Sequence, residues 1–283
     1  MKLKQIDRRE GLTRESFANE YLSSLTPVVF TDLMDPWAAK DKWSVEFFKS
    51  KYGHLKVPVF SANYSKPGKG YMVPDKTMTF REFFSTLESG PTDLRMFLFN
   101  IFRHAPELCD DFSTHTIMDG FIKQFPFMFF GGEGSHVALH YDIDMSHVFL
   151  NQIHGRKRVV LFSQEQSRNL YRHPYTVASY IDVNNPDYEK YPALKLVEGY
   201  EVMLQPGETL FIPSGHWHYI EYTDFGYSIS LRSSDSVLRK VKGMYNIATH
   251  YVVDKGMNKL MGPKWRELKA TLAKKRAEEL IEA

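Results

Sequence analysis

The feature that most restricts the fold is the stretch from about residue 126 to 232, where short β-strand patterns follow one another with turns between them. Sequences such as Gly131-Gly132 and Pro206-Gly207 favour tight turns between these strands. Many short strands with no helices between them are typical of a sandwich or jelly roll. The predicted strands are residues 127–130, 137–142, 147–153, 158–162, 200–204, 209–212 and 227–231.

Helical patterns flank this segment and divide the chain into three predicted regions: 1–125, 126–234 and 235–283. In the first, Thr13 and Ser44 stand where a helix N-cap is expected, and Thr79 with Glu82 forms a capping-box pattern. In the last, apolar residues recur at helical spacing and predict two helices, interrupted near Gly262. Those helices must bury their apolar faces, so a partner chain is a good candidate.

The charge balance argues against a nucleic-acid surface, because Lys+Arg 36 against Asp+Glu 34 gives a net charge of only +2. The one local basic excess lies near the C-terminus, where acidic residues interleave with it, and this predicts a solvated helix face. Its basic residues are Lys269, Lys274, Lys275 and Arg276.

The single cysteine, Cys109, excludes an intrachain disulfide and a metal site built from several thiolates. Residues 1–9 lack the apolar core of a signal peptide, and no run approaches the ~18 apolar residues of a membrane helix. The sequence therefore predicts a cytoplasmic protein with no membrane segment.

His140 and Asp142 are the first candidate metal ligands. Positions i and i+2 of a strand point to the same face, so within the predicted strand 137–142 the imidazole and the carboxylate converge. His218 follows the strand 209–212 and a Pro213-Ser214-Gly215 turn. Two histidines and one carboxylate on one face of iron leave three positions open, whereas zinc prefers four ligands and calcium more oxygens.

Alternatives remain open at each of these positions. His140 and Asp142 also fit a hydrogen-bonded pair without a metal, and His216 shares the strand phase of His218 and is the rival third ligand. Lys157 enters a predicted strand, where burial of a lysine is costly unless it meets an anion. The alternative is that its ammonium group reaches the surface.

Four segments together resemble the cupin-like JmjC oxygenases, and among them the asparaginyl hydroxylases. They are His140-Tyr141-Asp142, the strand that ends at His154-Gly155-Arg156-Lys157-Arg158, the segment 183–201, and Pro206-Gly207-Glu208-Thr209-Leu210-Phe211-Ile212-Pro213 with Trp217-His218. The resemblance is close over about 126–232 and looser toward the N-terminus.

This resemblance implies a mainly β fold with helical additions: a double-stranded β-helix (jelly roll, cupin-like) core followed by C-terminal helices. It implies that His140, Asp142 and His218 bind Fe(II), and that Lys157 binds the cosubstrate 2-oxoglutarate. It also implies that the C-terminal helices form a homodimer. The three regions then become a wrapping α/β region, a JmjC core and a dimerisation element.

Three positions depart from the family pattern. Val137 stands where the family often has a hydroxyl residue, and the segment between Asp142 and Gly155 is two residues longer than in the hydroxylases. This leaves open which of the residues 146–148 takes the place of a cosubstrate-contacting asparagine. Arg232 stands where the hydroxylases have another asparagine; it is a candidate for binding a carboxylate of cosubstrate or substrate, or for an internal ion pair.

Two further features are weaker candidates. Asn100, in the strand-like stretch 95–100, is a candidate to face the pocket. The long irregular insertion 174–192 has tyrosines in and around it that fit either a substrate groove or ordinary loop packing. They are Tyr171, Tyr175, Tyr180, Tyr188 and Tyr191. His136, His147 and His154 are interpreted as wall, structural or exposed residues rather than ligands.

The sequence thus predicts an oxygenase that hydroxylates a side chain of a peptide or protein. Hydroxylation of a small molecule or free amino acid, and lysine demethylation, are the alternatives within the same chemistry. The alternative from another class is a metal-binding cupin that is not an oxygenase, which would not need Lys157.

Overall fold

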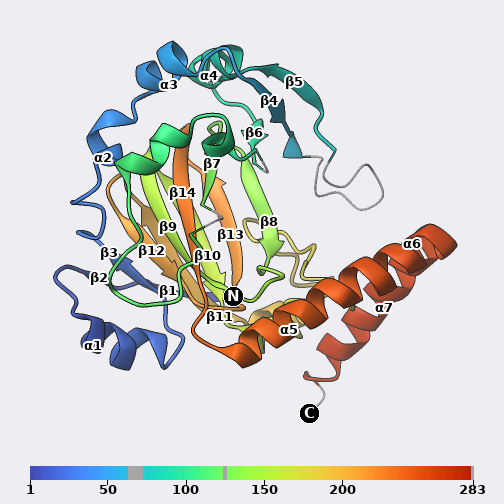
Figure 1. Ribbon diagram of the computed structural model, residues 1–283. Helices are drawn as coiled ribbons and strands as arrows, with labels where there is room; N and C mark the ends of the chain where they lie inside the picture. Colours follow the sequence, from blue (N-terminus) through green and yellow to red (C-terminus); the bar gives the residue numbers. More distant parts are fainter. Residues whose placement is uncertain (63–72, 98, 124–125, 282–283) are drawn as a thin grey trace.

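Two β-sheets form the centre of the computed structural model, which describes residues 1–62, 73–97, 99–123 and 126–281 (Figure 1). The five-stranded sheet has the order β1 (Lys2–Gln5), β11 (Glu198–Leu204), β10 (Lys157–Phe162), β13 (Trp217–Tyr222) and β8 (His136–His140). The seven-stranded sheet has the order β2 (Arg8–Arg9), β3 (Val28–Phe30), β12 (Thr209–Ile212), β9 (His147–His154), β14 (Gly226–Ser233), β7 (Phe127–Gly131) and β6 (Arg95–Met96).

The path of the chain between the sheets is that of a jelly roll. Most connections between successive core strands cross from one sheet to the other; the exception is β10 to β11, which pair with each other in the smaller sheet. The strands β7, β9, β12 and β14 thus lie in the larger sheet, and β8, β10, β11 and β13 lie in the smaller. All pairs among these eight strands are antiparallel. The predicted fold class is confirmed.

The N-terminal region adds strands to both sheets and covers the larger one with helices. β1 pairs parallel with β11, and β3 pairs antiparallel with β12. The helices are α1 (Arg14–Phe17) with its π-helical continuation η1 (Ala18–Leu22), α2 (Ala39–Lys42), α3 (Val45–Lys51) and α4 (Phe80–Glu88), and β4 (Lys56–Val59) pairs with β5 (Lys76–Thr79). Strands from residues 1–125 thus belong to the same two sheets as the core strands. The division of the chain into three regions stays a prediction.

The predicted helix caps are confirmed. The side chain of Thr13 accepts a hydrogen bond from the Ser16 amide, and that of Ser44 accepts one from Phe47. Thr79 and Glu82 form both bonds of a capping box at the start of α4. These caps orient α3 and α4 so that their aromatic residues pack on the larger sheet; for example, the rings of Phe80 and Phe130 lie 5.1 Å apart, edge to face.

Short 3₁₀ helices connect the remaining elements: η3 (Ile101–Arg103), η4 (Pro106–Asp111), η5 (Gln164–Ser167) and η6 (Pro192–Leu196).

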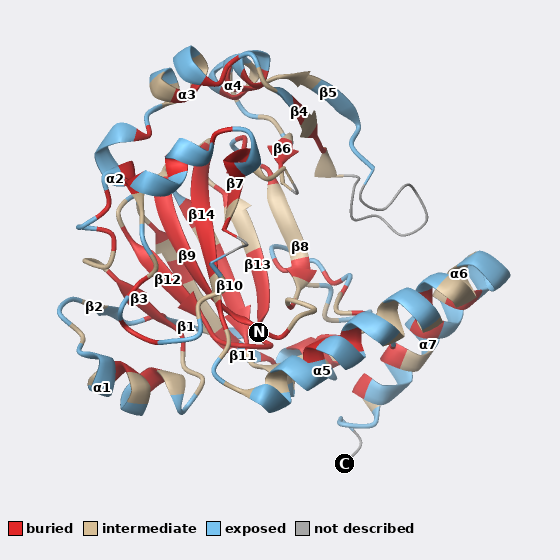
Figure 2. Ribbon diagram, in the orientation of Figure 1, coloured by how far each residue is buried: buried red, intermediate tan, exposed pale blue. Residues whose placement is uncertain are grey.

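The C-terminal region is helical, as predicted, and the apolar stripe of its first helix is not packed on the jelly roll. α5 (Val237–Ala248), the π-helical segment η7 (Thr249–Asp254) and α6 (Lys255–Met261) follow one another directly, and α7 (Pro263–Glu278) begins after Gly262, whose φ is +53°. The predicted stripe of Val237, Val241 and Tyr245 is exposed, at 77%, 49% and 67%. Much of the ribbon of α5 is coloured as exposed in Figure 2. The residues that α5 buries are Gly243 and Asn246.

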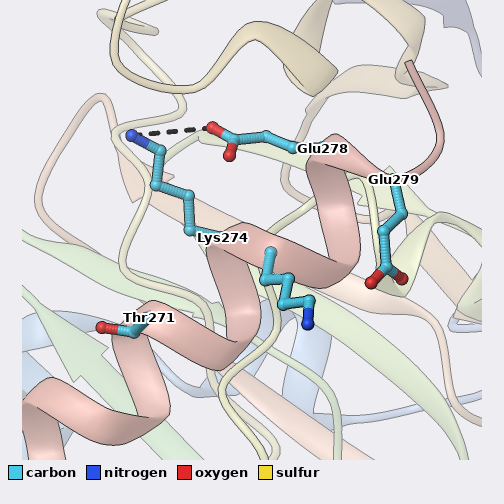
Figure 3. Close-up of a pocket in the computed structure, with 5 residues that line it drawn as sticks. Thr271, Lys274, Glu278 and Glu279 are labelled. Carbon is cyan, nitrogen blue, oxygen red and sulfur yellow. Dashed lines mark ion pairs between the residues drawn. The ribbon is translucent and has the colours of Figure 1, made fainter. Parts of the chain in front are cut away.

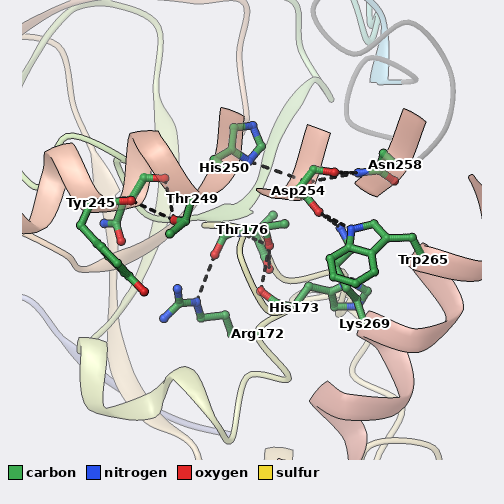
Figure 4. A network of polar contacts seen from close by, with 12 residues as sticks. Arg172, His173, Thr176, Tyr245, Thr249, His250, Asp254, Asn258, Trp265 and Lys269 are labelled. Carbon is green, nitrogen blue, oxygen red and sulfur yellow. Dashed lines mark hydrogen bonds and ion pairs between the residues drawn. The ribbon is translucent and has the colours of Figure 1, made fainter. Parts of the chain in front are cut away.

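A buried ion pair joins the two arms of this C-terminal hairpin (Figure 4). Lys269 on α7 donates to Asp254 at the end of η7, and the indole of Trp265 donates to the same carboxylate at 2.9 Å. The ring of Tyr175, from the long insertion, stacks on Trp265 at a centroid distance of 5.8 Å. The hairpin is therefore attached to the jelly roll through this loop.

Candidate metal centre

His140, Asp142 and His218 converge at one point between the sheets. One ligand atom from each side chain lies within 4.8 Å of the others. The strands β8 and β13 are neighbours with His140 and His218 in register, so the two imidazole rings lie side by side with centroids 4.3 Å apart. The sequence pattern therefore identifies three side chains that the fold brings together.

The convergence has a different local cause from the predicted one. Strand β8 ends at His140 rather than continuing to residue 142, and the amide of Tyr141 donates to the carbonyl of Val177 at 3.0 Å. Asp142 lies in the turn that follows, where its carbonyl accepts from Met145 at 3.1 Å. The prediction for His218 also needs correction, because it is the second residue of β13 and does not merely follow a strand.

Backbone carbonyl groups fix the orientation of both histidines. Nδ1 of His140 donates to the carbonyl of Ala138 at 2.9 Å, and Nδ1 of His218 donates to that of His216 at 3.1 Å. This selects the tautomer that leaves Nε2 as a lone-pair donor, as is usual for metal-binding histidines. Burial lowers the pKa of His140 to about 4 and also lowers the pKa of His218, so both rings are neutral at pH 7.

Asp142 is ionised in this environment. Burial alone would raise the pKa of its carboxyl group, but the charge of Arg232 and its hydrogen bond to Asp142 lower the pKa below its usual range. Two neutral imidazoles and one carboxylate form a donor set that fits a divalent iron ion and leaves three coordination positions open. The residues present therefore fit the metal that the resemblance implies.

His216, the rival third ligand, does not belong to this group of converging atoms. It is buried, and burial lowers its pKa to about 4. Its backbone carbonyl orients His218. The geometry thus favours His218 as the third ligand.

Lys157 points inward, which excludes the alternative of a side chain that reaches the surface. It is 1% exposed, and its ammonium group donates to the hydroxyl of Ser228 on the opposite sheet at 2.5 Å. It also lies 4.3 Å from the centroid of the Tyr222 ring. Burial, with a contribution from Arg95, lowers the pKa of Lys157 well below its ordinary value. Among the described residues, no carboxylate forms an ion pair with Lys157, so it is suited to receive an anion.

Arg232 forms the internal ion pair that was one of its two predicted roles. Its guanidinium donates to Asp142 at 3.0 Å and to Asp144 at 3.0 Å. A third hydrogen bond of 2.9 Å goes to the hydroxyl of Ser146. A direct role in binding a cosubstrate carboxylate has no support from these contacts.

Asn100 does not lie in the predicted strand. Strand β6 ends at Met96, and Asn100 caps the short helix η3, where its side-chain oxygen accepts from the Phe102 amide at 3.1 Å. Of the predicted stretch 95–100, residues 95–96 form a strand, residue 98 lies outside the described residues, and Asn100 is the N-cap of η3. Asn100 has extended dihedrals but is not part of a paired strand, and its side chain is used in the cap.

Sequence reasoning missed Asp144, Tyr222 and Ser228 as parts of the site. A signal existed for two of them, since Tyr222 has the strand phase of His218, and Ser228 that of Arg232. Asp144 lies in a turn, where no periodicity shows which way a side chain points.

The remaining candidates have structural roles. His147 is fully buried, accepts from the Ser214 amide at 3.0 Å and lies 3.1 Å from the carboxylate of Asp235. The rings of Tyr171 and Tyr191 pack edge to face at 4.8 Å. The contact supports loop packing for these two tyrosines, whereas Tyr175 and Tyr180 are 44% and 43% exposed.

The charged face of α7 carries a shallow cavity (Figure 3). Its lining includes Lys274 and Glu278, which form an ion pair one helical turn apart at 3.6 Å. Such a face is solvated, as the sequence predicts. Lys269 is the exception, because it is buried and paired with Asp254 rather than exposed.

Comparison with known proteins extends the structural result. Residues 14–248 match the family described as "Cupin-like domain". Lysine-specific demethylase JMJ30 of Arabidopsis thaliana is 29% identical over 242 residues, 80% of this chain and 54% of that protein. Lysine-specific demethylase 8 of Xenopus tropicalis is 30% identical over 230 residues, 76% of this chain and 50% of that protein.

A third relative, tRNA wybutosine-synthesizing protein 5 of Gallus gallus, is 28% identical over 248 residues, 80% of this chain and 76% of that protein. This chain spans about half the length of the two demethylases. In the described part of the chain, no helix combines the length and the apolar character that a membrane span requires. The family match runs from α1 to the end of α5 and includes all eight core strands, so the chain belongs to the cupin-like JmjC family.

Proposed function

We propose that this protein is an Fe(II)- and 2-oxoglutarate-dependent oxygenase that hydroxylates a side chain of a peptide or protein. The observation that carries the proposal is the group formed by His140, Asp142 and His218, whose donor atoms are those of a metal centre with open positions. Lys157, buried in the same interior, supplies the cation that a dicarboxylate cosubstrate needs.

In this mechanism His140, Asp142 and His218 hold the metal, and Lys157 holds the distal carboxylate of 2-oxoglutarate. Bound iron would supply the oxidising chemistry, in which O2 and 2-oxoglutarate yield succinate, CO2 and a hydroxylated C–H bond of the substrate. The chain's contribution is to orient the two imidazoles, to keep Asp142 ionised and to bury the site between two sheets. Such fixed geometry and charge are what a protein adds to cofactor chemistry.

Lysine demethylation is the second candidate, and the names of two relatives favour it. Hydroxylation of an N-methyl group gives an unstable product that releases formaldehyde, so the same centre serves both outcomes. A tRNA substrate, suggested by the name of the third relative, is disfavoured by the net charge of +2.

Two further parts of the proposal concern assembly and location. We propose that two copies pair through the segment formed by α5, η7 and α6, because it exposes several large apolar side chains. Its members are Val237, Leu238, Val241, Met244, Tyr245, Val252 and Leu260. We also propose a cytoplasmic location, since the single cysteine forms no disulfide and a reducing compartment preserves Fe(II).

The test is to load the protein with Fe(II) and 2-oxoglutarate without oxygen, admit O2 and measure succinate, with and without candidate peptides. We expect slow succinate formation that His140→Ala abolishes, and faster turnover with the true substrate. Formaldehyde release from a methyl-lysine peptide would select demethylation. If calorimetry finds no 2-oxoglutarate bound to the metal-loaded protein, a non-oxygenase metal-binding cupin is the better description.

A further inference from the structure

The turn that carries Asp142 is held by one guanidinium group. Arg232 on β14 donates to Asp142, Asp144 and Ser146, at 3.0, 3.0 and 2.9 Å. β14 belongs to the larger sheet and β8, which precedes the turn, to the smaller one. Since the donors of a guanidinium lie in one rigid plane, three acceptors at such distances fix the turn relative to the opposite sheet.

The contact with Asp142 involves a single carboxylate oxygen. Arg232 donates to Oδ1, and no hydrogen bond of the described residues involves Oδ2. The carboxylate is thus held in one orientation with one oxygen left for a metal. Ligation through one oxygen preserves the three open positions on which the proposed function depends.

Asp144 balances the charge that Arg232 introduces. A guanidinium paired only with Asp142 would cancel the negative charge that attracts a divalent ion. With Asp144 in the same network, two carboxylates are paired with one guanidinium, which leaves one net negative charge at the turn.

Helix α5 supports the same turn from the other side. A Cβ on Gly243 would lie 2.4 Å from the carbonyl oxygen of Asp144, so the helix backbone packs directly on the turn. The side-chain amide of Asn246 donates to the carbonyl of Ile143 at 3.4 Å. The hydroxyl of Ser214 donates to the carbonyl of Met145, whose φ is +56°.

We propose that Arg232 is a positioning residue for the metal ligand Asp142, with Asp144 as its charge-balancing partner and α5 as the support of their turn. This inference rests on the proposed metal centre but assigns to Arg232 neither ligation nor cosubstrate binding. Residues that orient metal ligands typically change metal affinity about 10–100-fold when replaced.

The test measures Co(II) binding, because this probe does not require turnover and its visible absorption reports coordination geometry. Titration calorimetry and absorption spectra are recorded for the wild type, Arg232→Met, Arg232→Lys and Asp144→Asn. We expect about 10–100-fold weaker binding and an altered spectrum for Arg232→Met. We expect a weakened site in Asp144→Asn, and partial recovery in Arg232→Lys, which keeps the charge but not the planar donors.

Arg158→Met is the matched control. Arg158 is also a partly buried strand arginine, with a side chain 23% exposed against 19% for Arg232, and it pairs with Glu201 away from the metal centre. This variant should bind Co(II) like the wild type, which separates a positioning effect from the general loss of a buried ion pair.

Two results would overturn the inference. Unchanged affinity and spectra in Arg232→Met and Asp144→Asn would show that the network does not position the ligand. Tighter binding in Arg232→Met would show that Arg232 acts only through electrostatic repulsion of the metal. If Arg232→Met fails to fold, the Co(II) affinity and spectra of Asp144→Asn and Arg232→Lys test the inference instead. Failure of the wild type to bind Co(II) would instead reject the metal centre itself.

Discussion

Lys157 is an ionisable side chain that is almost completely buried. The free-energy cost of burying its charge predicts how protonation is coupled to binding of the proposed cosubstrate. Burial lowers the pKa of the ammonium group well below its ordinary value, yet only the protonated form pairs with a carboxylate. Binding of a dicarboxylate should therefore bring a proton onto Lys157.

We predict that 2-oxoglutarate binding to the metal-loaded protein takes up protons, and that affinity declines as pH rises above the lowered pKa of Lys157. Calorimetry in buffers of different ionisation enthalpy measures this uptake. Lys157→Met should abolish it and weaken binding about 10–100-fold. A control ligand, 2-oxobutyrate, lacks the distal carboxylate and should be unaffected. Equal proton uptake by the wild type and Lys157→Met would contradict the prediction.

His115 is a second residue with a measurable consequence. It is 6% exposed, stacks on Trp37, and its Nε2 lies 2.7 Å from the side-chain oxygen of Asn151. Burial lowers its pKa to about 4. Between that pH and about 6.5, His115 is protonated in the unfolded chain but neutral in the folded chain. The free energy of unfolding therefore falls as pH is lowered through this window.

We predict that His115 contributes up to about 3 kcal/mol to the loss of stability between pH 7 and pH 4. Urea unfolding across this range should show a smaller loss for His115→Gln than for the wild type. Parallel curves would mean that other buried histidines carry the whole effect.

At the scale of elements, the C-terminal hairpin depends on one buried ion pair. Asp254 accepts from both Lys269 and Trp265, and the side chains of Asp254 and Lys269 are 7% and 5% exposed. Loss of the carboxylate leaves a buried, unpaired ammonium group, which typically costs about 3–5 kcal/mol.

Asp254→Asn should therefore lower the thermal midpoint and speed hydrogen exchange in α7. Lys274→Met removes an exposed ion pair from the same helix and should change little. Equal exchange in both variants would show that apolar packing alone holds the hairpin.

The elements could be predicted where local patterns decide them. Strand β12 matches its predicted bounds, and β7, β9, β10, β11 and β14 differ by at most two residues at each end. The sequence does not predict β13, because Trp217 and His218 directly follow the turn-forming residues Pro213-Ser214-Gly215. The orientation of α5 could not be predicted from periodicity, because the side packed on the core is chosen by Gly243 and Asn246, not by its apolar stripe.

The residues of the candidate site, too, could be predicted only where a local sequence pattern decides them. The family motif predicts His140, Asp142 and His218 as a group, and the three side chains do converge. The expectation that Asp142 lies in the same strand as His140 is wrong, because β8 ends at His140. The partners of Arg232 come from a turn and another strand, and only the tertiary structure brings them within hydrogen-bonding distance.

At the scale of the whole molecule, the exposed apolar side chains of α5, η7 and α6 predict self-association. Leu238 and Val252 are 76% and 73% exposed. We predict that Leu238→Glu with Val252→Glu converts a dimer into a monomer in sedimentation velocity, because burial of two carboxylates in the interface is unfavourable. Lys240→Glu, at an exposed polar position of the same helix, should leave the dimer intact. A monomeric wild-type protein would refute this assembly.

The outward side of α5 and the side that packs on the turn are under different structural constraints. Its outward residues can change with whatever surface the protein meets, while Gly243 has no room for even a methyl group beside Asp144. Among natural variants, the outward residues of this helix should therefore differ more than the residues that pack on the turn. For protein engineering, the C-terminal hairpin is not an interchangeable module: a graft that improves association but replaces Gly243 would displace the turn that bears Asp142.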